Sequence, residues 1–142
     1  MPETLDKPPA PTGRDHCWLP RSNHSPALAR RQLRAFLSTV HGGERFAENG
    51  ELLVSELVTN ALLHGTRRGK LIGLGFEADS ARLLIWVDDA SDHTPQLRIE
   101  ADGESGRGLL LVDKLAETWG WGAREGIGKR VWCCLAPSPA VT

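Results

Sequence analysis

The stretch of sequence that decides the fold runs from residue 56 to residue 65 and reads Glu-Leu-Val-Thr-Asn-Ala-Leu-Leu-His-Gly. Its apolar spacing predicts the second half of a helix over about 45–64, and Gly65 is a typical stop. Glu56 and Asn60 lie four residues apart and therefore share one face of that helix. Apolar residues border them on both sides, so we expect the helix to be largely buried.

This placement puts a carboxylate and an amide within an apolar surface. Burying them without partners would cost several kcal/mol, so either the protein or a ligand must satisfy them. A carboxylate in apolar surroundings holds a proton more readily and can act as a general base. The oxygen of Asn60 suits Mg²⁺, which prefers oxygen ligands. A buried pair satisfied by the protein's own groups is the alternative that this spacing leaves open.

A second candidate site lies at the end of a predicted strand over 82–89. Alternation places Asp89 on the same side as the apolar residues 83, 85 and 87, and Asp88 on the other side. A carboxylate at a strand end commonly caps a turn. Alternatively, Asp89 accepts a hydrogen bond from an amino group such as that of adenine, a contact that discriminates strongly.

A third candidate site opens the next predicted helix, over about 106–117. Gly106 and Gly108 let the backbone approach a phosphate, and the free N–H groups of a helix start favour an anion. Arg107 between them could add a charge-assisted contact. A plain helix-entry turn is the alternative. The polar segment 90–105 before it is long for a connection, which is typical of a functional lid or of disorder.

The helices and strands predicted over the rest of the chain indicate the fold class. Ser25 is expected to cap the first helix, with Pro26 at its first position. The arginines of that helix lie off its apolar stripe and indicate a solvated face or, less favoured, a docking face. We predict a two-layer α/β sandwich with helices on one face of a mixed, mostly antiparallel sheet. The expected strands are 16–21, 71–77, 82–89, 118–121 and 129–135, and the expected helices are 25–40, 45–64 and 106–117.

Composition limits the function classes. A chain of 142 residues fits one domain, with a disordered proline-rich arm at 1–15, the domain at 16–136 and a tail at 137–142. The net charge of −1 gives no electrostatic footprint for nucleic acid, and no apolar run reaches the ~20 residues of a membrane span. The three cysteines lack metal-ligand spacing and favour a cytoplasmic location.

The three motifs taken in order resemble those of the GHKL ATPase superfamily, the Bergerat-type ATP-binding fold of histidine kinases and gyrase-type topoisomerases. These motifs are the helix stretch 56–65, Val-Asp-Asp-Ala-Ser at 87–91 and Ser-Gly-Arg-Gly-Leu-Leu-Leu-Val at 105–112. The short chain and the Glu-x-x-x-Asn-Ala-x-x-His-Gly helix look most like the anti-sigma-factor serine/threonine protein kinases. The resemblance covers about residues 16–136.

The resemblance implies a role for each matching position. Glu56 would be the general base that activates a substrate hydroxyl, and Asn60 would hold Mg²⁺ against the phosphates of ATP. Asp89 would bind the adenine amino group. The further contacts to the nucleotide would come from Ser91, Gly106, Arg107, Gly108 and Leu109.

The implied activity is transfer of the γ-phosphate of ATP to a protein partner, a sigma factor and/or an anti-anti-sigma factor, and a homodimer is plausible by the same resemblance. The chain departs from the family pattern at two places. Ser91 and His93 replace two glycines after Asp89, and Lys129 replaces a threonine, where a solvent-facing lysine is preferred over one that reaches a phosphate. The alternatives are therefore a catalytically weak module that sequesters a sigma factor or antagonist, or a plain ATP hydrolase.

Overall fold

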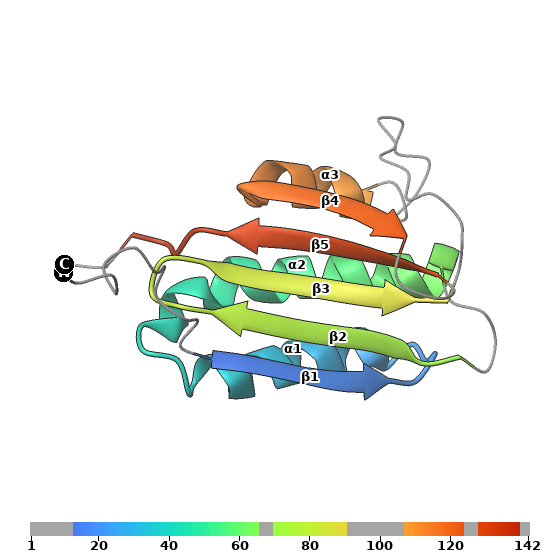
Figure 1. Cartoon of the computed structure of the whole chain (residues 1–142), viewed down its shortest axis with the longest axis horizontal. Coiled ribbons are helices and arrows are strands. Elements are labelled where there is room, and N and C mark those ends of the chain that lie inside the picture. Colours follow the sequence, from blue (N-terminus) through green and yellow to red (C-terminus); the bar gives the residue numbers. More distant parts are fainter. Residues whose placement is uncertain (1–12, 66–69, 91–106, 124–127, 140–142) are drawn as a thin grey trace, which may run out of the picture.

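The computed structural model describes residues 13–65, 70–90, 107–123 and 128–139. Five strands and three α-helices make up these parts, together with a 3₁₀ turn and a π-helical turn that flank the second helix (Figure 1). In chain order they are β1 (Gly13–Leu19), α1 (Ser25–Leu37), η2 (Gly43–Phe46), α2 (Ala47–Asn60), η3 (Ala61–Gly65), β2 (Ile72–Ala78), β3 (Leu83–Asp89), α3 (Arg107–Leu115), β4 (Thr118–Ala123) and β5 (Lys129–Leu135).

The strands form one sheet in the order β1-β2-β3-β5-β4. Each described pair of neighbours is antiparallel, so the parallel component expected of a mixed sheet is absent from this part of the chain. All three α-helices cover the same face of the sheet (Figure 1). The predicted two-layer α/β sandwich is therefore confirmed.

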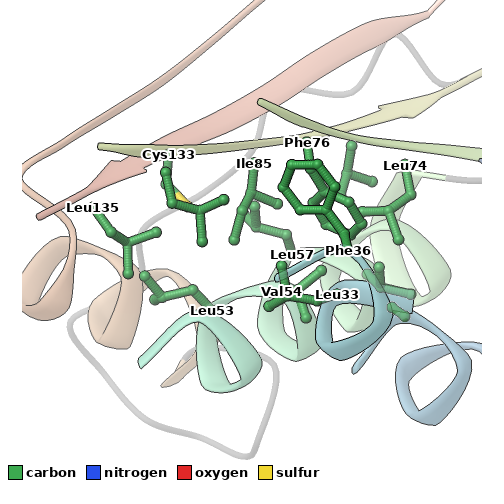
Figure 2. Packing of buried hydrophobic residues seen from close by; sticks show 14 of the residues in the cluster. Leu33, Phe36, Leu53, Val54, Leu57, Leu74, Phe76, Ile85, Cys133 and Leu135 are labelled. Carbon is green, nitrogen blue, oxygen red and sulfur yellow. The ribbon is translucent and has the colours of Figure 1, made fainter. Parts of the chain in front are cut away.

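The core lies between that face and the helices. Alternate strand residues point down onto α1 and α2, as Figure 2 shows. Phe36 and Phe76 stack across the two layers with their ring centroids 5.4 Å apart. Full burial of one such side chain contributes roughly 1.5–3 kcal/mol. The most deeply buried members of the core include Leu33, Leu53, Val54, Leu57, Leu74, Ile85, Cys133 and Leu135.

The edge strand β1 begins earlier than the sequence indicates. Gly13, Arg14 and Asp15 belong to it and pair with the end of β2, so the arm expected over 1–15 does not extend to these residues. Gly13 has no side chain, and those of Arg14 and Asp15 are polar and exposed. The backbone pairing of an edge strand gives such residues no apolar signature. Residues 1–12 lie outside the described residues.

Helix α1 differs from expectation in how it starts and in what its arginines do. His24 is the N-cap residue, and Ser25 is buried inside the first turn, where its hydroxyl donates a hydrogen bond to the carbonyl oxygen of Pro20. Arg30 donates to Ser55 Oγ and Arg34 pairs with Glu51, so two of the arginines bridge α1 to α2. The expected solvated face is thus partly an interhelical contact.

Burial of Cys133 makes the stability of the fold sensitive to alkaline pH. Burial, with a contribution from Cys134, raises the pKa of the Cys133 thiol from 9.0 to about 12. Above about pH 9 the unfolded chain loses this proton and the native chain keeps it, so stability falls as pH rises toward 12. The slope from this group is up to about 1.4 kcal/mol per pH unit.

Urea unfolding at several pH values from about 8 upward measures this slope. The Cys133→Ala variant should show a flatter decline than the unmodified chain, whatever its absolute stability. The chain has no tyrosine, so no phenol titrates in the same range. Two parallel pH profiles would contradict the assignment.

Candidate functional site

The predicted site elements meet at one end of the sheet. The carboxyl end of β3, the end of α2 with η3, and the amino end of α3 all lie at the right-hand end of Figure 1. Helix α2 packs against α3, and η3 packs against β3. Residues on three separate stretches of sequence therefore lie at the same end of the sheet.

Glu56 and Asn60 lie on the last turns of α2 and differ in their access to solvent. Asn60 is the final α-helical residue and is only 7% exposed. Glu56 is half-buried and lies at the rim of a surface depression of about 510 Å³. The carboxylate is thus reachable from outside the protein, while the amide is enclosed. The other residues of the depression are Arg30, Glu48, Glu51, Leu52 and Ser55.

The expectation that this helix is largely buried holds for one flank of the helix and not for the other. Leu52 is 45% exposed and Leu63 is 57% exposed, although both flank the face that carries Glu56. The other flank is buried, with Leu53 and Leu57 in the core. Glu56 therefore lies at the boundary between core and solvent, because α2 covers the sheet with only part of its circumference.

The helix does not stop in α form at Asn60. It continues as the π-helical turn η3 and ends at Gly65, where the sequence predicts the end of the helix. Short π-helical turns occur frequently at functional sites. The backbone N–H of Ala61 is shared between the carbonyl oxygens of Leu57 and Val58. The wider turn begins directly after Asn60 and changes the course of the chain where the amide is placed.

Asp89 lies on the helix-covered side of β3, as its alternation with the apolar residues predicts. Its carboxylate is 1% exposed and pairs with the ammonium of Lys129, with 2.9 Å between Nζ and Oδ2. The expectation that Lys129 faces solvent is wrong, because its side chain is 3% exposed. The register of β3 and β5 places the two residues directly opposite each other, so both side chains point to the same face.

The preceding residue, Asp88, forms an equivalent ion pair on the uncovered face of the sheet, with Arg130 directly opposite it on β5. Its carboxylate accepts two hydrogen bonds from Arg130, from Nε at 2.7 Å and from Nη2 at 2.9 Å. The hydrogen bond to Asp88 raises the pKa of Arg130. The Arg130 guanidinium also lies 5.2 Å from the ring centroid of Trp86. Two successive carboxylates are thus neutralised on opposite faces by two successive cations.

Gly128 holds the start of β5 against the end of β3. Its φ is +109°, and a Cβ added there would lie 1.9 Å from the carbonyl oxygen of Asp89. No side chain fits such an approach, and the backbone conformation also favours glycine. This close contact fixes the position of Lys129, the next residue, beside Asp89.

The third motif is only partly described. Arg107, Gly108 and Leu109 form the first turn of α3, and for these three residues the backbone alone is described. The start of the helix therefore agrees with the prediction. Ser91, Gly106 and the expected lid over 90–105 lie outside the described residues, apart from Ala90. Whether the first turn of α3 contacts phosphate stays a prediction.

Lys129 is the site residue that sequence reasoning placed wrongly. A signal for it exists in the sequence: β3 ends in two acidic residues and β5 begins with two basic ones. If antiparallel pairing aligns those ends, each acidic residue faces a basic one. The sequence does not show that β5 pairs with β3, or in which register, so it does not predict the Asp89–Lys129 ion pair.

The described residues contain neither a metal-binding cluster nor a membrane-spanning helix. In residues 13–65, 70–90, 107–123 and 128–139, no three His, Cys, Asp or Glu side chains gather in a way that could hold a metal ion. Within the same ranges, none of the helices has the length and apolarity needed to cross a bilayer.

Comparison with known protein families finds a match. A family model described as the histidine kinase-like ATPase domain matches residues 19–134, which is most of the chain. The matched range contains all four side chains described above, Glu56, Asn60, Asp89 and Lys129. No curated protein matches the chain.

Proposed function

We propose, since the chain belongs to the histidine kinase-like ATPase domain family, that it is an ATP-dependent serine/threonine protein kinase of the anti-sigma type. Family membership supports ATP binding in a regulatory role. The observation that carries the kinase proposal is the pairing on α2 of an accessible carboxylate, Glu56, with an enclosed amide, Asn60, one turn later. An accessible base suits a large second substrate such as a protein.

The residues present fit ATP and Mg²⁺. Asn60 offers an amide oxygen, and Mg²⁺ in nucleotide sites usually has few protein ligands beside phosphates and water. The lack of a three-residue metal cluster in the described part of the chain is consistent with that arrangement. Asp89 supplies a buried acceptor for the adenine amino group, and the first turn of α3 supplies N–H donors for phosphate.

Phosphoryl transfer requires mainly that the protein position the two substrates and stabilise the charge on the phosphates. The carboxylate of Glu56 accepts the proton of a serine or threonine hydroxyl on the partner as that oxygen bonds to the γ-phosphorus. The bond between the γ-phosphorus and the bridging oxygen breaks, and ADP leaves. Mg²⁺, when bound, neutralises charge on the phosphates. Asn60 orients the nucleotide, and Asp89 fixes its base.

We propose a sigma factor and/or an anti-anti-sigma factor as the partner, a homodimer as a plausible assembly, and the cytoplasm as the location. The resemblance of the α2 motif to the anti-sigma kinases supports these proposals. The near-neutral net charge of −1 gives no reason to expect direct contact with nucleic acid.

Titration calorimetry with ATP tests the first step. Heat of binding should appear with ATP and Mg²⁺ and should weaken strongly when EDTA removes the cation. Transfer of label from [γ-³²P]ATP to purified sigma-factor antagonists, followed by phosphoamino-acid analysis, tests the second step. Absence of any heat with ATP would refute the whole proposal. Binding without transfer to any tested antagonist would refute the kinase part.

The Asp89–Lys129 ion pair favours a second candidate, a module that sequesters its partner without phosphate transfer. A carboxylate already paired with an ammonium is a weaker attractant for an amino group than an isolated one. Ser91 and His93, in place of two family glycines, point the same way. Tight partner binding that is independent of ATP and of Glu56 would establish this candidate in place of the kinase.

A further inference from the structure

The uncovered face of the sheet is aromatic at its centre. This face is turned toward the viewer in Figure 1, and among the described residues no helix lies on it. The solvated face of an antiparallel sheet is usually polar. Here Trp86 of β3 lies directly opposite Trp132 of β5, and Trp18, on the edge strand β1 of the same face, is 55% exposed. Large aromatic side chains gathered on one surface commonly mark an interaction site.

Trp86 also carries a buried donor that lacks an acceptor. The residue is 5% exposed, and its indole lies directly over Gly75, where an added Cβ would come within 2.0 Å of the ring. The indole N–H can only donate, and among the described residues it finds no hydrogen-bond partner. An enclosed donor without an acceptor is costly. An acceptor from elsewhere in the chain would remove that cost.

The side chain that shields this ring is weakly held. The guanidinium of Arg14 lies 5.8 Å from the ring centroid of Trp86. Its ion pair with Glu77 is long, at 3.9 Å, and the Arg14 side chain is 71% exposed. Exposed pairs of this kind contribute little to stability. Arg14 can therefore swing aside and admit another segment to Trp86 at small cost.

The segment that precedes β1 offers acceptors of a suitable kind. Residues 8–11 read Pro-Pro-Ala-Pro. Proline-rich segments favour the polyproline II conformation, whose carbonyl groups make no hydrogen bonds within the segment. A proline has a backbone acceptor and no donor. Aromatic surfaces recognise such segments well, because the extended helix is already formed and loses little entropy on binding.

The segment is also attached at the right place. Residues 8–11 lie two to five positions before Gly13, the first residue of β1, so they reach up to roughly 18 Å from it at about 3.3–3.6 Å per residue. Trp86 lies two strands away from β1, in register with His16 through Gly75. Standard strand spacings put it roughly 14 Å from Gly13. A segment tethered this closely has a high effective concentration at the face.

We propose that residues 8–11 of this chain pack on the uncovered face of the sheet, where one of their carbonyl oxygens accepts the hydrogen bond of Trp86 Nε1–H and their proline rings contact Trp18. The proposal goes beyond the kinase function and does not depend on ATP. The segment shields the exposed indole and satisfies the buried donor in one step.

Nuclear magnetic resonance of the ¹⁵N-labelled full chain tests this contact. The chain has five tryptophans and therefore five indole N–H signals, which single Trp→Phe variants assign. A variant with glycine in place of Pro8, Pro9 and Pro11 keeps the length of the segment and removes its conformational preference. The signals of Trp18 and Trp86 should shift in this variant. Deuterium exchange of the Trp86 indole proton should become about tenfold faster, the size expected for one lost hydrogen bond.

Two internal controls and a matched variant accompany the test. Trp119 and Trp121 pair with Cys133 and Val131, so they lie on the helix-covered face, and their signals should not move. Pro139→Gly is the matched variant, because Pro139 is an exposed proline at the other end of the chain. It should leave all five signals in place.

The remaining outcomes overturn the proposal. Signals of Trp18 and Trp86 that stay fixed in the triple variant show that the segment does not contact the face. Movement of all five signals shows a change of the whole fold instead. Shifts that disappear on dilution, with a dimer mass in light scattering, assign the face to a second copy of the chain. The measurements need no nucleotide, so each result leaves the proposed function untouched.

Discussion

Glu56→Gln should reduce phosphate transfer by about 10²–10⁴-fold, the usual contribution of a positioned general base. Glutamine keeps the size and the hydrogen-bonding reach of the side chain but cannot accept the hydroxyl proton. ATP binding should stay within about twofold, because the role assigned to Glu56 is with the partner's hydroxyl and not with the nucleotide. Quantifying labelled partner over time, beside calorimetry with ATP, checks both parts.

The matched control for this experiment is Glu48→Gln. Glu48 is an exposed carboxylate on the same helix and lies at the same depression, two turns before Glu56. Its replacement should leave the transfer rate unchanged. A Glu56→Gln protein that transfers phosphate at the unmodified rate would refute the general-base role. Equal losses in both variants would indicate that the depression docks the partner and that neither carboxylate handles the proton.

Breaking the buried ion pair should be the most destabilising change at the site. Lys129→Met leaves the Asp89 carboxylate enclosed without its cation, and Asp89→Asn leaves the ammonium without its anion. Each should lower the free energy of unfolding by about 3–5 kcal/mol. The double variant should recover a large part of that loss, because it leaves no unbalanced charge behind. Urea unfolding of the four proteins gives the coupling energy directly.

The exposed pair Arg82–Glu117 serves as the control cycle. Its atoms are also 2.9 Å apart, but the two side chains are 56% and 41% exposed. Its coupling energy should stay below about 1 kcal/mol. Losses that simply add in the Asp89–Lys129 cycle would show that the two charges are stabilised separately. Because Asp89→Asn is expected to weaken the fold, its effect on ATP binding must be judged on protein shown to be folded.

The fold was largely predictable because the core imposes its periodicity on the sequence. The alternation over β3 gave the strand, its covered face and the orientation of Asp89. The spacing of Glu56 and Asn60 gave a shared helical face. Both inferences need only the local geometry of a strand or a helix. The end of the second helix at Gly65 followed from the same kind of local signal.

Contacts between segments that are distant in the sequence could not be predicted from local sequence patterns. The arginines of α1 lie off its apolar stripe, and that is compatible with solvent or with a neighbouring helix. Arg30 reaches Ser55 only because α1 and α2 pack side by side. Lys129 depends on which strand β5 joins and in which register. Such facts belong to the tertiary structure, and no window of local sequence contains them.

The charges at the end of β3 also help to set the register in which β3 pairs with β5. Asp88 faces Arg130 and Asp89 faces Lys129 on opposite sides of the same ladder. A slip of one residue would exchange the faces of β5, bring Lys129 into the open and push Arg130 into the core. Slipped one way, Asp89 would be enclosed opposite Gly128 with no cation across from it; slipped the other way, Asp89 would face Arg130 and Asp88 would face Val131. The two ion pairs thus make one alignment of these distant strands far more favourable than its neighbours, and they do so at the edge where the nucleotide is proposed to bind.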